Sequence, residues 1–385
     1  KINKENEEID KLIKKLKEIL SQKDIRMNII KDELSEIKDR YGDKRRSEIE
    51  HSAAEFTVED MIPDEDMVLT ISHQGYIKRT SLTEYRTQGR GGVGARGVIT
   101  KDDDFTEHLF IASTHNYLLI FTEFGKVFWK KVWEIPEGSK VSKGRAIQNL
   151  INIEREDKVR SVINVKNLSD KDYLNNNYLV MCTKKGTVKK TTLEAYSRPR
   201  VNGINAIKIK ENDRLLDVKL TNGDNHIVIA KKSGKAIRFH ESNVRPMGRV
   251  ASGVRGVRLE NDKDYVIGII CISREDSDLL VVSENGYGKR SSINDYRITK
   301  RGGKGVMTLK TTDKTGNLVS IKEVKTNDEL MIINQSGITI RISINDQNIR
   351  VMGRATQGVR LIKLNDDDKI SSVAKIEIID DENKE

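Results

Sequence analysis

Residues 179–193 read LVMCTKKGTVKKTTL: an apolar run, a short turn that closes on Gly186, and a second run that carries two adjacent lysines. This order is typical of a β-hairpin, because glycine adopts the positive φ that a tight turn requires. Five other stretches follow the same plan, at 69–82, 119–132, 227–240, 280–293 and 330–344. The six turn glycines are Gly75, Gly125, Gly186, Gly234, Gly286 and Gly337, separated by 50, 61, 48, 52 and 51 residues. The chain therefore repeats one hairpin unit.

Each repeat contains more than its hairpin. A second glycine precedes a short apolar segment in every copy, and one further apolar strand, such as 214–221 (RLLDVKLT), separates consecutive hairpins. The second glycines are Gly94, Gly144, Gly203, Gly253, Gly305 and Gly358. About four strands in a repeat of about fifty residues are typical of blades around an axis, because such blades bury their faces against their neighbours. We therefore predict an all-β, six-bladed, propeller-like disc with four-stranded blades.

The first part of the chain has a different periodicity. Ile9, Leu12, Leu16 and Ile19 recur at steps of three and four residues, which predicts an amphipathic helix, and a second such pattern follows. Gly42 is expected to end the second helix in a left-handed conformation. We predict a helical segment over 1–42, a linker over 43–60, the six-bladed domain over 61–376 and an acidic tail over 377–385. Because the chain begins with lysine, we expect a fragment of a longer protein.

The charge of the chain indicates a polyanionic partner. Its 385 residues have a formal net charge of +10, and residues 51–364 carry about +14 once the near-neutral start and the acidic end are subtracted. Such a basic body is typical of proteins that bind nucleic acid or a membrane surface, and charge alone does not choose between them. No apolar stretch reaches the roughly 18 residues of a membrane span. Cys182 and Cys271 lie in apolar runs, so we interpret them as core residues in a reducing, cytoplasmic setting.

The sequence does not support catalysis or cofactor binding. Residues 87–97 (TQGRGGVGARG) contain Gly92, Gly94 and Gly97 in the spacing GxGxxG, but a dinucleotide loop must open a helix, and the residues that follow have no helical period. The histidines and cysteines form no metal-ligand spacing. No nucleophile, base or carboxylate pair stands in a catalytic arrangement. We therefore expect no catalytic residue, metal or cofactor in this chain.

Basic residues recur in the strand that follows each turn glycine. Because equivalent positions of a blade lie at equivalent places around a disc, we predict a ring of positive charge at its perimeter, which suits the phosphates of bent duplex DNA. The alternative is that these side chains only solubilise the sheets. Glycine-rich loops add arginines and lysines that can approach phosphate closely. The predicted contacts are Lys78, Arg79, Arg96, Lys130, Lys131, Lys189, Lys190, Arg238, Arg249, Lys289, Arg290, Lys300, Arg301, Lys304, Arg341 and Arg354.

Several stretches of the repeats resemble those of a known family. Residues 245–257 (RPMGRVASGVRGV), 284–297 (ENGYGKRSSINDYR) and 349–362 (IRVMGRATQGVRLI) resemble the blade motifs of a six-bladed β-pinwheel, the C-terminal DNA-wrapping domain of the DNA gyrase A subunit. Residues 1–50 resemble the last helices of the breakage-reunion region of the same protein. The resemblance covers nearly the whole chain.

The hallmark of that family is the gyrase box, with the form Gln, basic, Arg, Gly, Gly, basic, Gly, in the loop after the first hairpin. In this sequence Gly89 and Val93 occupy the two basic positions, while Arg86 and Arg96 flank the loop. Residues 299–305 (TKRGGKG) resemble the box in charge but lie in the fifth repeat. The resemblance implies DNA binding by Gln88, Gly89, Arg90, Gly91, Gly92, Val93 and Gly94.

The resemblance also implies a role in DNA supercoiling. A domain of this family wraps duplex DNA in a positive sense, so that DNA gyrase, a bacterial type IIA topoisomerase and hence an isomerase, introduces negative supercoils by ATP-dependent strand passage. The implied partners are double-stranded DNA, the A-subunit breakage-reunion domain and the gyrase B subunit, in a heterotetramer of the cytoplasm and nucleoid. ATP and Mg²⁺ would bind elsewhere in that enzyme. The chain itself would lack the catalytic tyrosine, and in isolation we expect it to be a monomer.

Two alternatives stay open at this point. One is a topoisomerase IV-type C-terminal domain that binds DNA without chiral wrapping, and the other is a propeller that serves as a protein-interaction scaffold. Six complete repeats and a partly retained box favour the gyrase family. An aromatic content of 5% and the lack of a Trp-Asp dipeptide argue against the scaffold.

Overall fold

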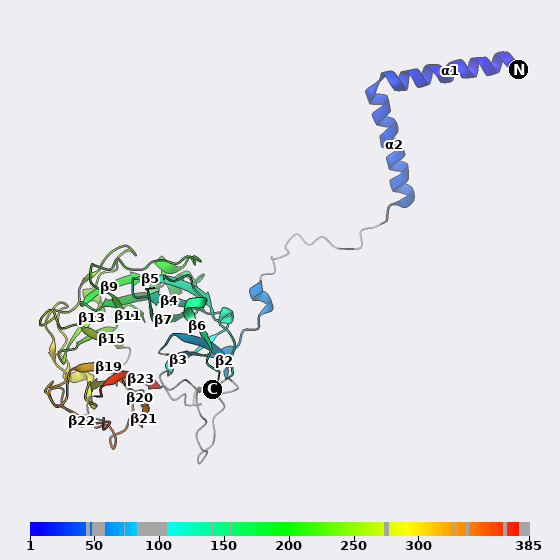
Figure 1. The fold of residues 1–385 in the computed structure, drawn as a ribbon. Helices are drawn as coiled ribbons and strands as arrows, with labels where there is room; N and C mark the ends of the chain where they lie inside the picture. Colours follow the sequence, from blue (N-terminus) through cyan, green and yellow to red (C-terminus); the bar gives the residue numbers. More distant parts are fainter. Residues whose placement is uncertain are drawn as a thin grey trace. The chain divides into compact units, whose positions relative to one another are not determined.

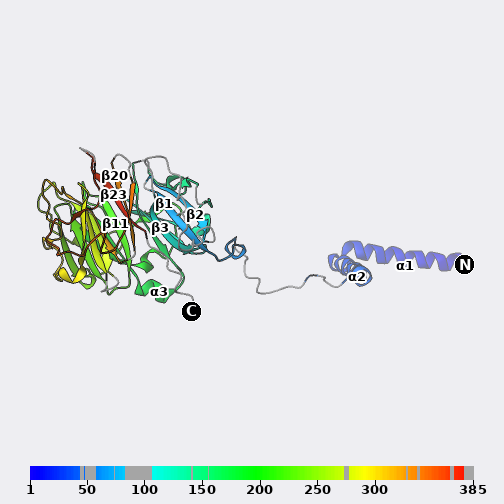
Figure 2. The same cartoon turned by 90° about the horizontal axis from the view of Figure 1, so that it is seen from below.

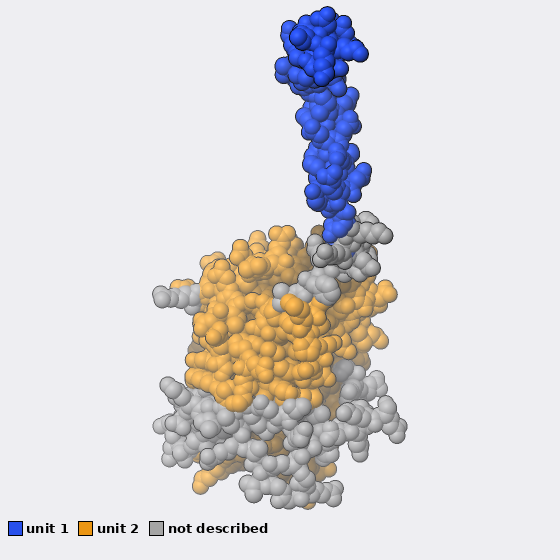
Figure 3. All heavy atoms as spheres, turned by 90° about the vertical axis from the view of Figure 1, so that its right-hand side faces the viewer, with its two compact units in different colours: residues 1–58 blue, residues 59–385 orange. Residues whose placement is uncertain are grey.

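The computed structural model divides into two units. It describes residues 1–43, 47, 58–72, 74–82, 106–139, 142–154, 156–272, 277–326, 328–335, 339–364 and 368–376. The units span Lys1–Val58 and Glu59–Glu385, and Figure 3 shows them in different colours.

The first unit consists of two helices, α1 (Ile2–Ser21) and α2 (Lys23–Tyr41), as the apolar periodicity predicts. Neither helix buries a residue, and most of their apolar side chains stay exposed. Gly42 follows α2 with an extended backbone, φ −71°, so the left-handed cap that we expected there is wrong. The orphan carbonyl of Lys38 is instead met by the Gly42 N–H.

The second unit is a ring of six antiparallel sheets, which we number blades 1 to 6 in the order of their central hairpins (Figure 1). This confirms the six-bladed fold predicted from the glycine spacing. Blade 1 contains β3 (Thr106–Ser113), β1 (Asp66–Ser72), β2 (Tyr76–Ser81) and β6 (Arg145–Ala146); blade 2 contains β7 (Val159–Val165), β4 (Tyr117–Thr122), β5 (Lys126–Lys131) and β10 (Ile204–Asn205); blade 3 contains β11 (Leu215–Thr221), β8 (Tyr178–Thr183), β9 (Thr187–Thr192) and β14 (Val254–Arg255); blade 4 contains β15 (Val266–Ile272), β12 (His226–Lys231), β13 (Lys235–His240) and β18 (Val306–Met307); blade 5 contains β19 (Leu318–Val324), β16 (Asp278–Ser283), β17 (Tyr287–Ser292) and β22 (Val359–Arg360). Among the described residues, blade 6 contains β23 (Ile370–Ile376), β20 (Glu329–Asn334) and β21 (Thr339–Ser343).

In the side view of Figure 2 the unit is a thick disc whose strands run between its two faces.

Short helices lie before or between these strands. The connecting helices are η1 (Val58–Met61), η3 (Val132–Glu134), η4 (Ile147–Asn149), α3 (Lys171–Asn176), η5 (Leu193–Tyr196), η6 (Glu241–Asn243) and η7 (Ile293–Asp295). A helix such as η3 follows directly on the last strand of a hairpin, which brings its carbonyl groups to the boundary with the preceding blade.

The fourth strand of a blade comes from the next repeat along the chain. β6 follows the hairpin of blade 2 but pairs with β2 of blade 1, with Ile77 opposite Arg145. β10, β14, β18 and β22 complete blades 2 to 5 in the same way. Consecutive blades are therefore interlocked, and these two-residue strands form the outermost edge of the ring (Figure 1).

The turn glycine of one repeat and the second glycine of the next repeat are both required by this exchange. Gly186 has a φ of 81°, and a Cβ there would lie 2.8 Å from Val257 Cγ1 and 3.0 Å from its carbonyl oxygen. Gly253 has a φ of 93°, and a Cβ there would lie 2.6 Å from the Val188 carbonyl oxygen. Glycine therefore serves twice, because it adopts a left-handed backbone and it lets the borrowed strand approach the hairpin closely.

The hydrophobic core lies between blades. Val180 and Val188 of blade 3 pack with Ile227 of blade 4 in one such cluster. Cys182 is fully buried in the same cluster and Cys271 packs against it, both as free thiols. Burial raises the pKa of both thiols, which keeps them protonated. The prediction of a core residue is confirmed for Cys182, while Cys271 is half-buried.

We expect Gly186→Ala to lower the free energy of unfolding by about 2 kcal/mol or more, because a left-handed alanine is strained and its methyl group meets Val257. Gly248→Ala is the matched control, since a Cβ there meets nothing within 4 Å. Urea unfolding followed by circular dichroism measures both. Equal midpoints for the two variants would contradict the role given to Gly186.

Candidate nucleic-acid interface

The basic side chains of the hairpin strands are mostly inside the disc. Lys189 and Lys289 have no exposed surface, and Arg290 is 1% exposed. Lys78, Lys190 and Arg238 are also buried. The prediction that these six residues line the perimeter is therefore wrong. A strand in the body of a blade is covered on both faces by neighbouring blades, so it has no solvent face on which a lysine can extend.

In blades 1, 2, 4 and 5 the fourth residue after the turn glycine binds the next blade. Its side chain donates to a main-chain carbonyl in the segment that follows the next hairpin. Arg79 Nε donates to Ile135 O at 2.8 Å, Trp129 Nε1 to Tyr196 O at 3.0 Å, Arg238 NH1 to Ile293 O at 2.8 Å and Arg290 Nε to Ile349 O at 2.8 Å. We name these contacts the inter-blade clasps. Their recurrence explains why a donor returns at this position in successive repeats.

The clasp of blade 3 is an ion pair. Lys190 Nζ lies 2.7 Å from Glu241 Oε2, and the Glu241 side chain is fully buried. The Glu241 carboxylate also accepts from Thr221 Oγ1 at 2.9 Å and from the Asn225 N–H at 2.7 Å. Lys190 Nζ lies 4.2 Å from the centre of the Tyr178 ring. These contacts offset the cost of removing both charges from water.

We expect Lys190→Met to lower the free energy of unfolding by about 3 kcal/mol, because it leaves the Glu241 carboxylate buried without its cation. Lys190→Met combined with Glu241→Gln should recover part of that loss, which a double-mutant cycle in urea measures. The control is Glu154→Gln, which removes the exposed Lys126–Glu154 pair and should change stability by less than about 1 kcal/mol. A loss for Lys190→Met no larger than the control would exclude the buried pair as a clasp.

Three other predicted bases are near the surface but have acidic partners. Lys130 Nζ lies 2.9 Å from Glu134, and Lys131 Nζ lies 2.5 Å from Glu59. Arg341 pairs with Glu329 of its own blade. These partners offset the charge available to an incoming anion.

The loops before the outermost strands carry the exposed bases. Arg249, Lys300 and Lys304 are exposed, while Arg301 and Arg354 are half-buried. The Arg301 guanidinium donates to Asn243 O at 2.9 Å and to Arg255 O at 3.0 Å. Arg354 NH1 donates to Met307 O at 3.0 Å. These five residues keep the surface location that the sequence predicted, and the gyrase-box residues Gln88 to Gly94 and Arg96 lie outside the described residues.

Sequence reasoning missed the bases of the outermost strands themselves. Arg145 of β6, Arg255 of β14 and Arg360 of β22 are all exposed. Each follows its second glycine by one or two residues, and this was the signal in the sequence. A hollow of about 790 Å³ lies next to this edge, lined by Lys126, Arg200, residues 201–205, Arg249 and Val250, with no acid among them.

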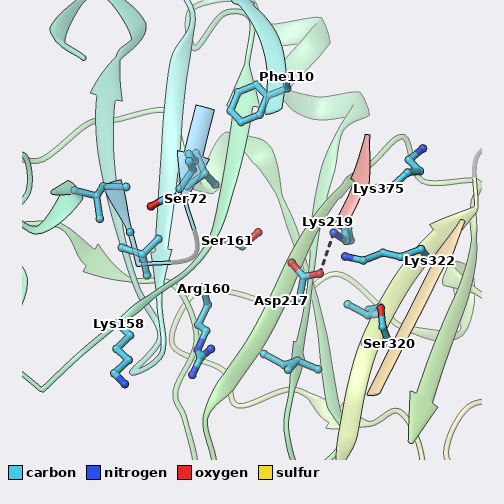
Figure 4. A pocket seen from close by; sticks show the side chains of 18 of the residues that line it. Ser72, Phe110, Lys158, Arg160, Ser161, Asp217, Lys219, Ser320, Lys322 and Lys375 are labelled. Carbon is cyan, nitrogen blue, oxygen red and sulfur yellow. Dashed lines mark ion pairs between the residues drawn. The ribbon is translucent and has the colours of Figure 1, made fainter. Parts of the chain in front are cut away.

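The axis of the disc contains a larger cavity of about 1080 Å³ (Figure 4). Its charged lining is mixed, because Lys219 and Lys322 point toward Asp217, while Lys375 points away from it (Figure 4) and lies 3.6 Å from Asp328. Lys219 Nζ pairs with Asp217 at 2.9 Å. No group of metal-ligating side chains occurs among the described residues, and none of their helices has the length and hydropathy of a membrane span. The perimeter differs from this cavity, because its outermost strands and their loops carry exposed arginines such as Arg145, Arg249 and Arg255.

The architecture defines a class: a six-bladed propeller with exchanged outer strands and an arginine-rich edge. The family model described as DNA gyrase C-terminal domain, beta-propeller, matches residues 66–113, 116–166, 177–222, 226–273, 277–325 and 328–377. The chain belongs to this family.

Curated relatives agree with the family match. The chain is 43% identical to the DNA gyrase A subunit of Staphylococcus epidermidis over 383 residues, which are 99% of this chain and 42% of the relative. It is 43% identical to the DNA gyrase A subunit of Staphylococcus aureus over 388 residues, which are 100% of this chain and 43% of the relative. The chain thus spans about two fifths of the length of these relatives.

Solved structures share the fold. The C-terminal domain of DNA topoisomerase IV matches with a TM-score of 0.69 and 26% identity over 82% of this chain and 95% of that chain. The DNA gyrase A C-terminal domain matches with a TM-score of 0.63 and 27% identity over 81% of this chain and 99% of that chain.

Proposed function

We propose that this chain binds duplex DNA along the edge of its disc and wraps it in a positive sense, so that a DNA gyrase can introduce negative supercoils. The observation that carries this proposal is the repetition of exposed arginines on the outermost strands and their loops, from Arg145 through Arg255 to Arg360. Family membership supports it, since the relatives are gyrase A subunits.

The physical basis of binding would be phosphate neutralisation around a curved edge. Each neutralised phosphate releases condensed counterions, which drives binding without reading sequence. Bending 20–30 base pairs costs on the order of 1–6 kcal/mol, so several such contacts must act together. An edge that bends DNA must itself resist bending. The interlocked blades would supply this stiffness, because each described outermost strand comes from one repeat and pairs with the blade of the preceding repeat.

In this proposal the chain acts within a larger enzyme. The A-subunit breakage-reunion domain and the gyrase B subunit would form a heterotetramer with it in the bacterial cytoplasm and nucleoid. ATP and Mg²⁺ would act in those other parts, and this chain would bend DNA without cutting it. None of the tyrosines of this chain is proposed as a nucleophile, and the isolated chain is expected to be monomeric.

A topoisomerase IV-type role is the second candidate. The larger TM-score with the topoisomerase IV domain, 0.69 against 0.63, favours it, as do the two basic positions lost from the box at Gly89 and Val93. Such a domain would bind DNA without chiral wrapping. The 43% identity to gyrase A subunits over the whole chain favours the first candidate.

A topological assay distinguishes these candidates. The full chain is bound to nicked circular DNA, the nick is sealed, and the linking number is read from a gel. A positive shift that grows with protein supports wrapping, and bound DNA without a shift supports the topoisomerase IV-type role. No binding at saturating protein contradicts both.

We expect Arg249→Gln with Arg354→Gln to reduce the magnitude of the salt slope, d log K/d log [salt], by about 2, because each arginine is proposed to neutralise one phosphate. The matched control is Lys14→Gln with Lys17→Gln on α1, which removes the same charge from the first unit. Affinity titrations from low to moderate salt measure the slopes. Equal slopes for the two double variants would contradict a contact role for Arg249 and Arg354.

A further inference from the structure

The third and fifth residues after the turn glycine alternate in character from blade to blade. In blades 1, 3 and 5 they are a lysine and a hydroxyl residue, and in the other blades they are mainly apolar. The lysine blades carry Lys78 with Thr80, Lys189 with Thr191 and Lys289 with Ser291, and the others carry Phe128 with Lys130, Ile237 with Phe239 and Ile340 with Ile342. The disc therefore repeats in pairs of blades.

The lysines of this pattern reach the loops that precede the outermost strands. Lys189 Nζ donates to Arg249 O at 2.5 Å and to Ala206 O at 2.6 Å. Lys289 Nζ donates to Gly353 O at 2.5 Å, beside Arg354. These bonds end on neutral carbonyls, in contrast to the ion pair of Lys190.

The first lysine and two of the hydroxyl residues, Thr80 and Ser291, add to the same support. Lys78 Nζ donates to Ser139 O and Ser142 O, both at 2.8 Å. Thr80 Oγ1 donates to Gly138 O at 2.9 Å, and Ser291 Oγ donates to Met352 O at 2.8 Å. In repeats 2, 4 and 6 the loop before the outermost strand is thus hydrogen-bonded through its carbonyls to side chains of the preceding blade.

We propose that Lys189 and Lys289 are positioning residues for DNA binding. Lys189 fixes the loop that carries Arg249, and Lys289 fixes the loop that carries Arg354, so that each arginine is held where it can contact a DNA phosphate. This inference rests on the proposed function. Neither lysine reaches the surface, so neither contacts DNA itself. Their effect passes through the main chain of the loop, because a charge-assisted bond to a carbonyl fixes the backbone next to the guanidinium.

Electrostatics couples each lysine to its arginine. Burial and then the Arg249 charge lower the pKa of Lys189 to about 8. Burial lowers the pKa of Lys289 to about 8, with Asp295 raising it and Arg354 lowering it. A phosphate beside the arginine offsets the positive potential and favours the protonated lysine.

Proton uptake follows from this coupling. If phosphate raises the pKa of the two lysines, the complex holds more protons than the free chain near pH 8. Affinity should therefore fall as the pH rises through that value. The Tyr196 hydroxyl shares Ala206 O with Lys189, and its pKa is raised by burial, so it stays neutral in this range.

The first experiment removes the support and leaves the surface charge intact. Lys189→Met with Lys289→Met is made in the full chain, and Lys208→Met with Lys310→Met, both exposed lysines, is the control. We expect the buried pair of substitutions to weaken DNA binding on the order of tenfold and to reduce bending of an end-labelled duplex, because the arginines lose their fixed position. The control should weaken binding less and retain bending.

A second measurement separates positioning from general destabilisation. Calorimetry near pH 8 in two buffers of different ionisation enthalpy should detect proton uptake on DNA binding by the unaltered chain and by the control. Arg249→Gln with Arg354→Gln, which leaves the buried lysines in place, should abolish that uptake. When the arginine and lysine substitutions are combined, the loss of DNA affinity should be smaller than the sum of the two separate losses.

The outcomes are distinct. Unchanged bending in a folded Lys189→Met/Lys289→Met chain, additive losses of affinity, or uptake that persists after both arginines are replaced would each overturn the inference. If the unaltered chain neither binds nor bends duplex DNA, the proposed function itself fails. Circular dichroism and urea unfolding establish that the variants are folded.

Discussion

The inter-blade clasp is the interaction on which the rest of the disc depends. A propeller has no core shared by all its parts, so its shape is decided at the joints between neighbouring blades. Between consecutive blades from 1 to 6, the joint combines a borrowed outer strand with a side-chain donor, such as the buried Arg290, which binds Ile349 O and pairs with Asp278 and Asp346. Removing such a donor leaves buried carbonyls without a partner, which costs more than the bond itself contributes.

The same joint separates two populations of positive charge. Donors on the hairpin strand must face the next blade, because that blade covers them. The borrowed strand lies at the outer edge, where only one side is covered, and so Arg255 and Arg360 stay exposed, with the Arg360 guanidinium donating to the Tyr287 hydroxyl. One construction rule of the fold therefore buries one set of bases and exposes the other.

The repeated glycines were enough to predict six blades, because a left-handed turn and a close approach each require glycine at a fixed position in the repeat. They did not reveal that the fourth strand is exchanged, since pairing between repeats leaves the spacing unchanged. The position of the hairpin bases was mispredicted for a physical reason. Lys189 and Lys190 point to opposite faces of a strand, and solvent was assumed on one face, while blades cover both. The box residues 88–94 remain a prediction.

Burial does not make a lysine irrelevant to a polyanion. The charge of Lys190 is offset at once by Glu241, and that of Lys231 by Glu260. Lys189 and Lys289 instead bind carbonyl dipoles, which stabilise the ammonium without neutralising it. Their field therefore extends through the low-dielectric interior toward the edge and adds to that of the arginines above them. A disc of this kind would attract DNA with more charge than its surface alone displays.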